Sequence, residues 1–314
     1  MMDVSIILVN WNTRDLLKEC ISSIFAQTKS NFEIFVVDNA SDDESAQMVR
    51  NYFPTVKLIE NSQNLGFAAA TNQAINVCQG KYIFLLNPDT KILDHAIDKL
   101  IAILNQNDQV GLVACKLLNR DFSVQTNVGK FYSFWNTLFT NPVISKFSNP
   151  IKLISNKQIS SSNHVSDQEI DWARSSALMI RKRAMDQAGY FDEQFYIYGE
   201  ELDLCWRLKH FGWKLLFHPN AEILHYGKAS SNQRKAEMFI QNNKSFYIFL
   251  KKNYPLYSYY LFRTRNIFYM FLKILGFSLL FNFKHNKDRE PGLKLCFVAL
   301  KWHFSKNSLI KVQS

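Results

Sequence analysis

Acidic and amide side chains recur in this sequence directly after apolar runs of strand length, where they could bind a ligand. Asp38 follows the run Phe32–Val37, and Asn87 and Asp89 follow Tyr82–Leu86. A carboxylate at such a point can accept a hydrogen bond from a ribose hydroxyl or a base imide, or hold a divalent cation against a diphosphate. A local turn or a helix cap is the structural alternative for either aspartate.

A second acidic group lies in the segment 198–207, which reads YGEELDLCWR. Glu200, Glu201 and Asp203 fall within four residues, and closely grouped carboxylates raise one another's pKa, which suits general-base catalysis. Asp203 and Arg207 are four residues apart and can pair on one helix face, whereas Glu201 points elsewhere. An acidic first turn that favours the helix dipole is the structural alternative.

His225 ends a further short strand-like segment, Pro219–Leu224. Its imidazole could bind a divalent metal or a diphosphate, although a lone histidine at a strand end is more often structural. The sequence contains no GxGxxG, GxxxxGK[ST], HExxH or GxSxG motif. Dinucleotide, P-loop, zinc-protease and serine-hydrolase chemistry therefore have no support.

The elements that must position these residues alternate along the chain. Apolar runs predict strands, and segments with apolar residues at helical spacing follow most of them. Strands are expected at Val4–Val9, Phe32–Val37, Val56–Glu60, Tyr82–Leu86 and Gly111–Leu117, and helices at Arg14–Gln27, Ser45–Tyr52, Gly66–Cys78 and Leu93–Asn105. This alternation predicts a doubly wound, mostly parallel α/β sheet, whose ligands bind beyond the carboxyl ends of the strands.

Charge separates the chain into two parts. The first 225 of its 314 residues carry 21 basic and 24 acidic side chains, whereas residues 226–314 carry 16 and 3. This basic region is rich in Phe and Tyr, and its apolar stretch Phe268–Phe281 is shorter than the about 20 residues of a membrane span. Basic and aromatic residues together favour an interfacial helix on anionic lipid. A helical subdomain is the alternative, and no nucleic-acid-binding motif accompanies the charge.

We therefore predict one domain over residues 1–230 and a helical, membrane-associating tail over residues 231–314. Residues 120–168 are less regular and are expected to form a variable insertion or a substrate-facing loop. Five scattered cysteines without a CxxC pair argue against a disulfide framework or a cysteine-rich zinc site. The N-terminal segment lacks the pattern of a signal peptide, so a cytoplasmic location is expected.

Seven short motifs occur together in the order that is typical of one enzyme family. They read VNWN at 9–12, VVDNAS at 36–41, NLGFA at 64–68, LNPD at 86–89, GYFDE at 189–193, YGEELDL at 198–204 and a histidine at 225. Over about residues 3–230 the sequence resembles family 2 inverting glycosyltransferases of the GT-A fold, in particular the rhamnosyltransferase-like branch. The resemblance implies a nucleotide-sugar donor, a Mg²⁺ or Mn²⁺ ion and direct displacement at the anomeric carbon.

The resemblance also implies roles in donor binding. Asn10 and Asp38 would hold the nucleoside, with Asn64 near the base or ribose. Asp89 matches the metal-binding carboxylate of the family's DxD motif. The first acidic position of that motif is Asn87 here, so the cation would rest mainly on Asp89 and the diphosphate.

Further roles follow for catalysis and for the acceptor. Glu201 stands where the family places its base, and His225 matches a histidine that can reach the metal or the diphosphate. Trp172 is expected in the acceptor region, together with the supporting residues Glu200, Asp203 and Arg207. The residues after Trp172 are Ala-Arg-Ser-Ser instead of the small Gly-Ala pair that is common in the family, so the acceptor pocket is expected to differ.

The expected function is transfer of a sugar, with dTDP-rhamnose favoured as the donor, to a lipid-linked or cell-surface polysaccharide acceptor. The enzyme would lie on the anionic inner face of the cell membrane. The same chemistry with a UDP-sugar donor is the first alternative, and a degenerate sugar-nucleotide-binding module is the second. A nucleotidyltransferase is disfavoured because the segment after the first strand, Asn10–Thr13, is not a Gly-rich basic loop.

Overall fold

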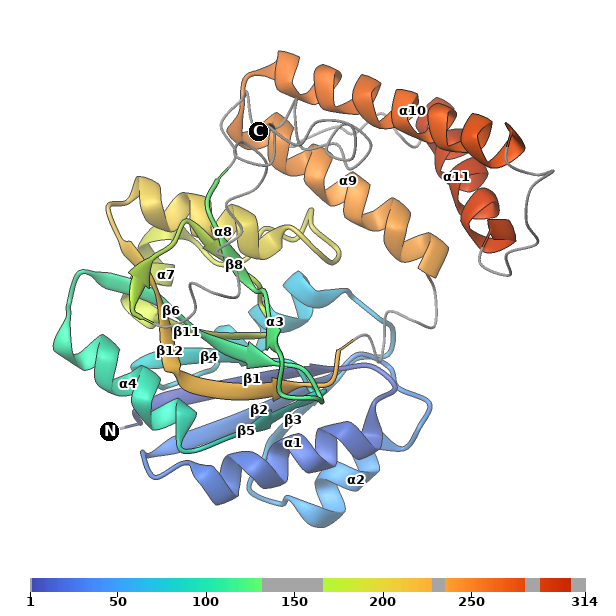
Figure 1. Cartoon of the computed structure of the whole chain (residues 1–314). Coiled ribbons are helices and arrows are strands. Elements are labelled where there is room, and N and C mark those ends of the chain that lie inside the picture. The colour runs from blue at the N-terminus through green and yellow to red at the C-terminus, as the bar shows by residue number, and fades with distance from the viewer. Residues whose placement is uncertain (1, 132–165, 228–234, 280–288, 306–314) are drawn as a thin grey trace. The chain divides into compact units, whose positions relative to one another are not determined.

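The computed structural model describes residues 2–131, 166–227, 235–279 and 289–305 (Figure 1). Most of the expected insertion at 120–168 lies outside these ranges. The contacts divide the chain into two compact units, Met1–Tyr196 with Glu200–Ser230, and Ile197–Gly199 with Ser231–Ser314. The functions that the sequence assigns to the two regions remain predictions.

The first unit is built on a ten-stranded sheet. Eight strands follow the order β3-β2-β1-β4-β11-β6-β12-β5, and the other two, β7 and β9, pair with β6 and β12. The strands are β1 (Val4–Asn10), β2 (Phe32–Asp38), β3 (Lys57–Glu60), β4 (Tyr82–Leu86), β5 (Thr90–Ile92), β6 (Val110–Leu118), β7 (Val124–Gln125), β9 (Gln168–Glu169), β11 (Ala177–Arg181) and β12 (Lys214–His225). A separate pair joins β8 (Val128–Gly129) and β10 (Trp172–Ala173). The pairs β1–β2, β1–β4, β2–β3 and β6–β12 are parallel, whereas β11 is antiparallel to both β4 and β6. The predicted mostly parallel α/β sheet is confirmed.

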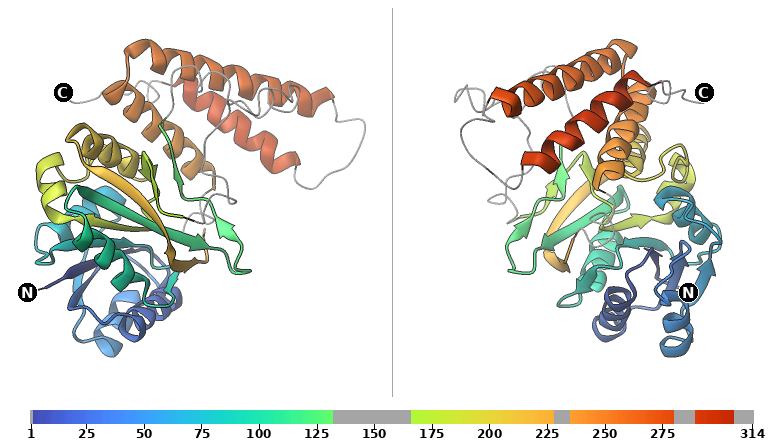
Figure 2. Two further views of the ribbon diagram at one scale, coloured as in Figure 1. Left: turned by 60° about the vertical axis from the view of Figure 1, so that its left-hand side comes forward. Right: turned by 90° about the vertical axis from the view of Figure 1, so that its right-hand side faces the viewer.

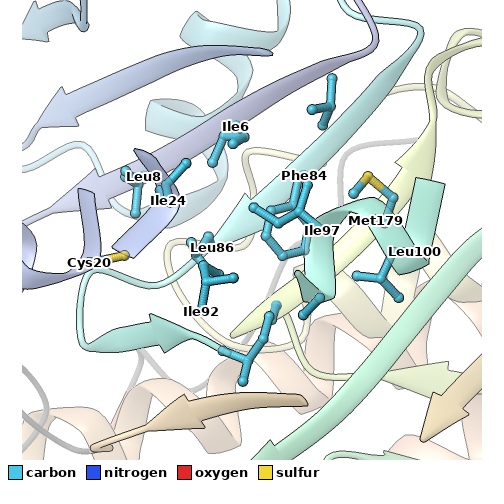
Figure 3. Close-up of a cluster of buried hydrophobic side chains, with 14 of the residues drawn as sticks. Ile6, Leu8, Cys20, Ile24, Phe84, Leu86, Ile92, Ile97, Leu100 and Met179 are labelled. Atoms are coloured by element: carbon cyan, nitrogen blue, oxygen red, sulfur yellow. The ribbon is translucent and has the colours of Figure 1, made fainter. Parts of the chain in front are cut away.

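Helices cover both faces of this sheet, as Figures 1 and 2 show. They are α1 (Arg14–Gln27), α2 (Ser45–Tyr52), α3 (Phe67–Ile75), α4 (Ala96–Gln106), α7 (Lys182–Ala188) and α8 (Glu200–His210). Alternate residues of β1 enter different cores. Ile6 and Leu8 lie in one core with residues of α1, α2 and α4 (Figure 3). Ile7 lies in the other core, with residues of α3, α7 and α8. Burial on both faces explains why the strands are continuous apolar runs.

Several predicted boundaries shift because the sheet adds pairing that local patterns do not show. Thr90–Ile92 forms β5 and pairs with Ile223–His225, so α4 begins at Ala96 and not at Leu93. A helix cap by Asp89 is therefore wrong, because a strand follows it. Strand β12 runs through Pro219 and spans twelve residues, with an irregularity between His218 and Glu222.

The described part of the second unit contains the helices α9 (Lys235–Asn253), α10 (Leu256–Leu279) and α11 (Arg289–Phe304). Its core includes Tyr247, Tyr259 and His303, and the Tyr247 hydroxyl lies 2.7 Å from Nε2 of His303. Within the described ranges, no helix combines the length and the mean hydropathy needed to cross a membrane.

Candidate functional site

The sheet brings the predicted donor-binding residues to one edge. In register, Asn10 pairs with Asp38 across β1 and β2, and Leu8 pairs with Leu86 across β1 and β4. Asn87 and Asp89 therefore follow β4 at the edge where β1 and β2 also end. This is the carboxyl edge, at which doubly wound sheets bind ligands.

Asn10 and Asp38 form one buried network in the sheet edge. Nδ2 of Asn10 donates to Oδ1 of Asp38 (2.9 Å) and to Oγ of Ser41 (3.0 Å), and Oδ1 of Asn10 accepts from Thr13 (2.6 Å). Asp38 also accepts from the backbone N–H and the hydroxyl of Ser41, so the local turn is present as well. The Asn10 amide thus holds Asp38 directly and through Ser41, which itself donates to Asp38. Nucleoside contacts of Asn10 and Asp38 remain predictions.

Asn64 lies in a loop that is fixed against Tyr196. Its Oδ1 accepts from the N–H of Gly66 (2.9 Å) and from the hydroxyl of Tyr196 (3.0 Å). Gly66 has φ +85°, and a Cβ there would lie 2.3 Å from the carbonyl oxygen of Tyr196. Only glycine fits this approach, so the loop that carries Asn64 has a defined position.

Asp89 and His225, 136 residues apart in sequence, meet at the same edge. Nε2 of His225 lies 3.3 Å from Oδ1 of Asp89, and the N–H of Tyr226 donates to the carbonyl oxygen of Asp89 (2.9 Å). Nδ1 of His225 lies 2.6 Å from Oε1 of Gln125. Asn87 is half-buried beside them, and its N–H donates to Ser176. The β5–β12 ladder, which pairs His225 with Thr90, is the element that brings these side chains together.

The pair Asp89 and His225 fits a divalent cation. Two neighbouring ligands at about 2.1 Å from an octahedral ion lie about 3.0 Å apart, close to the 3.3 Å separation observed. A carboxylate oxygen with an imidazole nitrogen is a ligand set that Mn²⁺ accepts. No group of three His, Cys, Asp or Glu side chains that could hold a metal occurs in the described part of the chain. Diphosphate oxygens and water would complete the coordination.

Glu200 and Glu201 open helix α8 in contrasting environments. Glu200 is 2% exposed, and its Oε2 has no hydrogen-bond partner within the described structure. Burial raises the pKa of Glu200 well above its ordinary value, and the charge of Glu201 and a hydrogen bond with it raise that pKa further. Burial therefore favours the neutral form of Glu200, and Glu201 is the half-buried member of the pair.

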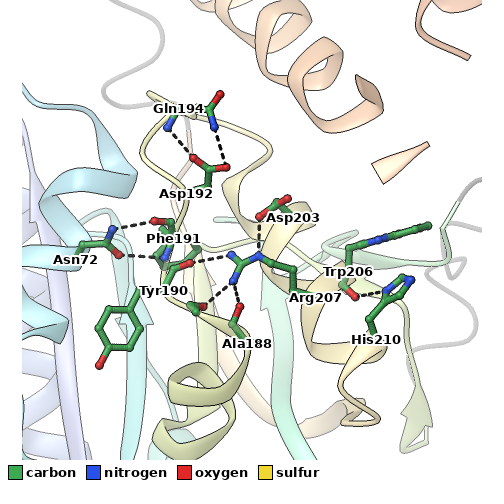
Figure 4. Close-up of polar contacts among 11 residues, drawn as sticks. Asn72, Ala188, Tyr190, Phe191, Asp192, Gln194, Asp203, Trp206, Arg207 and His210 are labelled. Atoms are coloured by element: carbon green, nitrogen blue, oxygen red, sulfur yellow. Dashed lines mark hydrogen bonds and ion pairs between the residues drawn. The ribbon is translucent and has the colours of Figure 1, made fainter. Parts of the chain in front are cut away.

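The predicted pair of Asp203 and Arg207 is confirmed (Figure 4). Nε of Arg207 donates to Oδ2 of the fully buried Asp203 (2.8 Å). The other guanidinium nitrogens donate to the carbonyl oxygens of Ala188, Gly189 and Tyr190. Arg207 thus joins helix α8, which carries Glu201, to the end of helix α7. Its supporting role in the site remains a prediction.

Trp172 is engaged with the β8–β10 pair. Its indole N–H donates to the carbonyl oxygen of Lys130 (3.0 Å). Its ring covers Gly129 so closely that a Cβ there would lie 2.5 Å from a ring carbon. These contacts give Trp172 a structural role, and an acceptor contact remains a prediction.

Two residues that hold parts of the site in place, Asn72 and Gln125, are absent from the sequence-based predictions. Asn72 holds the main chain of Phe191 through both amide atoms (Figure 4). The available signal in the sequence was an asparagine inside the Ala-rich helical segment 67–75. Gln125 lies in the segment interpreted as irregular, and no local pattern identifies it.

Comparisons with known proteins agree with this geometry. The family described as "Glycosyl transferase family 2" matches residues 5–159. An N-acetylglucosaminyl-diphospho-decaprenol L-rhamnosyltransferase of Mycobacterium tuberculosis is 26% identical over 258 residues, which cover 78% of this chain and 83% of the relative.

The Escherichia coli enzyme WfgD, a UDP-Glc:alpha-D-GlcNAc-diphosphoundecaprenol beta-1,3-glucosyltransferase, is 26% identical over 155 residues, 49% of this chain and 54% of that enzyme. Among solved structures, the mannosyltransferase PcManGT from Pyrobaculum calidifontis, in complex with GDP-Man and Mn²⁺, has a TM-score of 0.58 at 14% identity. That match covers 96% of this chain and 86% of the other, and it shows a common fold.

Proposed function

Because the chain carries a glycosyl transferase family 2 domain with the GT-A fold, it is a glycosyltransferase, and we propose that it acts on lipid-linked acceptors with inversion. The favoured donor is dTDP-rhamnose, and a UDP-sugar is the alternative. The Mycobacterium relative, named as a rhamnosyltransferase that acts on N-acetylglucosaminyl-diphospho-decaprenol, supports this choice. WfgD, named for a UDP-glucose donor and a GlcNAc-diphosphoundecaprenol acceptor, supports the same acceptor class and the alternative donor.

The convergence of Asp89 and His225 at the carboxyl edge of the sheet carries this proposal. The carboxyl group of Asp89 and the imidazole of His225 lie 3.3 Å apart, at the edge where Asn10 and Asp38 also lie, and this supports their proposed role as cation ligands. When bound there, a divalent cation offsets the negative charge of the departing nucleoside diphosphate. Asp38, held by Asn10, would orient the nucleoside.

Glu201 is the proposed general base. It would take the proton from an acceptor hydroxyl while that oxygen forms its bond to the anomeric carbon and the bond to the diphosphate breaks. One such displacement inverts the anomeric centre. Burial raises the pKa of Glu200 and so disfavours the charged form that a general base needs, which supports Glu201 in that role. Asp203 and Arg207 would fix the helix from which Glu201 projects.

A donor-hydrolysis assay tests the enzymatic part of the proposal. The purified full chain is incubated with dTDP-, UDP- and GDP-sugars in the presence of Mn²⁺ or Mg²⁺, and release of the nucleoside diphosphate is measured. We expect slow metal-dependent release from one donor and its loss in Asp89→Ala. Asp94→Ala is the matched control, because Asp94 is exposed and forms a surface ion pair with Lys99. Silence across the panel, with no nucleotide binding by calorimetry, would favour a degenerate binding module.

The general base is tested separately with a GlcNAc-diphospho-polyprenol acceptor. Glu201→Gln keeps the size of the side chain and removes its basicity, so this variant is expected to bind the donor normally and to lose transfer. General-base catalysis contributes about 10²- to 10⁴-fold. Full transfer by Glu201→Gln would exclude this residue as the base.

We further propose that the second unit binds the anionic inner face of the cell membrane. Residues 226–314 carry a net charge of +13. One face of α10 exposes large apolar side chains at helical spacing: Tyr257, Tyr260, Leu261, Phe268, Phe271, Leu272 and Leu275. The opposite face is anchored within the unit, since Asn266 bonds to Asn243 and Tyr247. A basic region with one apolar helix face is typical of interfacial helices.

Vesicle sedimentation tests the membrane proposal. We expect the full chain to bind vesicles that contain anionic phospholipid, and Phe268→Ser with Phe271→Ser to weaken this binding. Phe211→Ser, an exposed phenylalanine of the first unit, is the matched control. Equal vesicle binding by the double variant and the control would show that this face of α10 does not make the membrane contact.

A further inference from the structure

We propose that Gln125 is a positioning residue that fixes the tautomer of His225 and keeps Nε2 of its imidazole free to bind a cation beside Asp89. Gln125 lies in β7, and its Oε1 is 2.6 Å from Nδ1 of His225. Its part in cation binding rests on the proposed function, whereas the tautomer assignment rests on the hydrogen-bond network alone.

The orientation of the Gln125 amide follows from a chain of hydrogen bonds that begins at Asp121. The hydroxyl of Ser123 donates its one hydrogen to Oδ1 of Asp121 (2.5 Å), and this bond lowers the pKa of Asp121, so its carboxylate is an acceptor. Ser123 must then accept from Nδ2 of Asn119 (2.9 Å). Oδ1 of Asn119 consequently accepts from Nε2 of Gln125 (3.0 Å). The carbonyl oxygen of Gln125 is thereby turned toward His225.

The same logic assigns the protons of His225. Because Oε1 of Gln125 can only accept, Nδ1 of His225 must carry the hydrogen in their 2.6 Å contact. A neutral imidazole has one N–H, so Nε2 presents a lone pair, 3.3 Å from the carboxylate of Asp89. Two acceptors that face each other are unfavourable until a cation or a proton lies between them. The network thus prepares a cation site and prevents neutral His225 from closing it with a hydrogen bond to Asp89.

The backbone fixes the support of this network. The N–H of Asn119 donates to the carbonyl oxygen of Ser123, and the N–H of Phe122 donates to that of Asn119, which closes a tight hairpin between β6 and β7. Leu117 of β6 pairs with Gln125 in β7 and with Ile223 in β12. Strand β6 therefore sets the positions of Gln125 and of the strand that ends at His225. Outer residues that orient a metal-binding histidine in this way typically change metal affinity 10- to 100-fold when they are mutated.

The direct test is the tautomer of His225 in the metal-free full chain. Long-range ¹H–¹⁵N spectra of histidine-labelled protein, recorded well above the ordinary imidazole pKa of about 6.5, distinguish Nδ1–H from Nε2–H, and His225→Gln assigns the signal. We expect Nδ1–H in the wild type and in Gln125→Glu, which keeps an acceptor oxygen. Gln125→Met removes the acceptor, so its His225 is expected to change to Nε2–H and donate to Asp89. Nε2–H in the wild type, or Nδ1–H retained in Gln125→Met, would overturn the proposal.

Mn²⁺ binding in the presence of dTDP, followed by calorimetry, supplies a second readout. We expect Gln125→Met to bind Mn²⁺ about 10- to 100-fold more weakly, Gln125→Glu to remain within a few-fold of the wild type, and exposed Gln109→Met to be unchanged. Unchanged affinity in Gln125→Met, when the wild type binds, would refute the positioning role. A wild type that binds no Mn²⁺ would instead contradict the proposed metal site, and the spectra would still decide the tautomer.

Discussion

Replacing Arg207 with methionine should destabilise the first unit strongly. Arg207 donates to the fully buried carboxylate of Asp203 and to three main-chain carbonyl oxygens near the end of α7, and its own side chain is only 18% exposed. Arg207→Met keeps much of the aliphatic side chain but removes the guanidinium that pairs with the buried carboxylate of Asp203. Removing one partner of a buried ion pair costs about 3–5 kcal/mol. The expected loss in the free energy of unfolding is of that size.

Two further variants separate the charge from the carbonyl contacts. Asp203→Asn combined with Arg207→Met removes the buried carboxylate together with its cation. The free energy of unfolding of this double variant should therefore fall by only about 1–3 kcal/mol, the range for unsatisfied buried polar groups. Arg207→Lys keeps the charge but cannot reach all three carbonyl oxygens, and its loss should lie between wild type and Arg207→Met. Arg50→Met is the matched surface control, since its pair with Glu60 is exposed and should contribute less than about 1 kcal/mol.

Urea unfolding of the full chain, followed by tryptophan fluorescence, measures these differences. A loss below about 1 kcal/mol in Arg207→Met would refute the view that Arg207 stabilises the buried carboxylate of Asp203. A double variant that is as unstable as the sum of the two single variants would refute the coupling between Asp203 and Arg207. Mutations at this pair should also slow transfer, because α8 carries the proposed base Glu201.

Three further predictions concern stability and reactivity. Burial raises the pKa of Glu33, but its hydrogen bonds with Lys57 and Ser5 outweigh burial and hold that pKa below the ordinary value. Glu33→Gln should therefore lower the free energy of unfolding most at pH 7, and the difference from wild type should shrink below about pH 4.3. A difference that does not depend on pH would contradict this. Gly66→Ala should cost about 1–3 kcal/mol from its positive φ, and more from contact with Tyr196, whereas wild-type stability in chemical unfolding would refute the close approach. All five cysteines are buried, and burial raises the pKa of three of these thiols to about 12. A thiol reagent at pH 8 should therefore label none of them before the protein unfolds. Rapid labelling of the native protein would contradict their burial.

Local patterns predicted much of the first unit because its strands and helices bury regular apolar faces. The helices Arg14–Gln27 and Ser45–Tyr52 have the predicted boundaries. Strand β5 escaped prediction because three residues carry no periodicity, and only the ladder with β12 makes Thr90–Ile92 a strand. Spacing alone was also sufficient for Asp203 and Arg207, since an i, i+4 pair needs only a helix.

The sequence by itself determined which residue types follow each strand, the segregation of basic charge into the last part of the chain and the family to which its motifs correspond. Only the tertiary structure decided that Asp89 lies beside His225, that Gln125 contacts this histidine and that Glu200 is buried. The physical reason is that these contacts join residues up to 136 positions apart through sheet register, and register depends on the whole sheet. The pKa of Glu200 likewise depends on its burial in the folded chain, which the residue types around it in the sequence do not reveal.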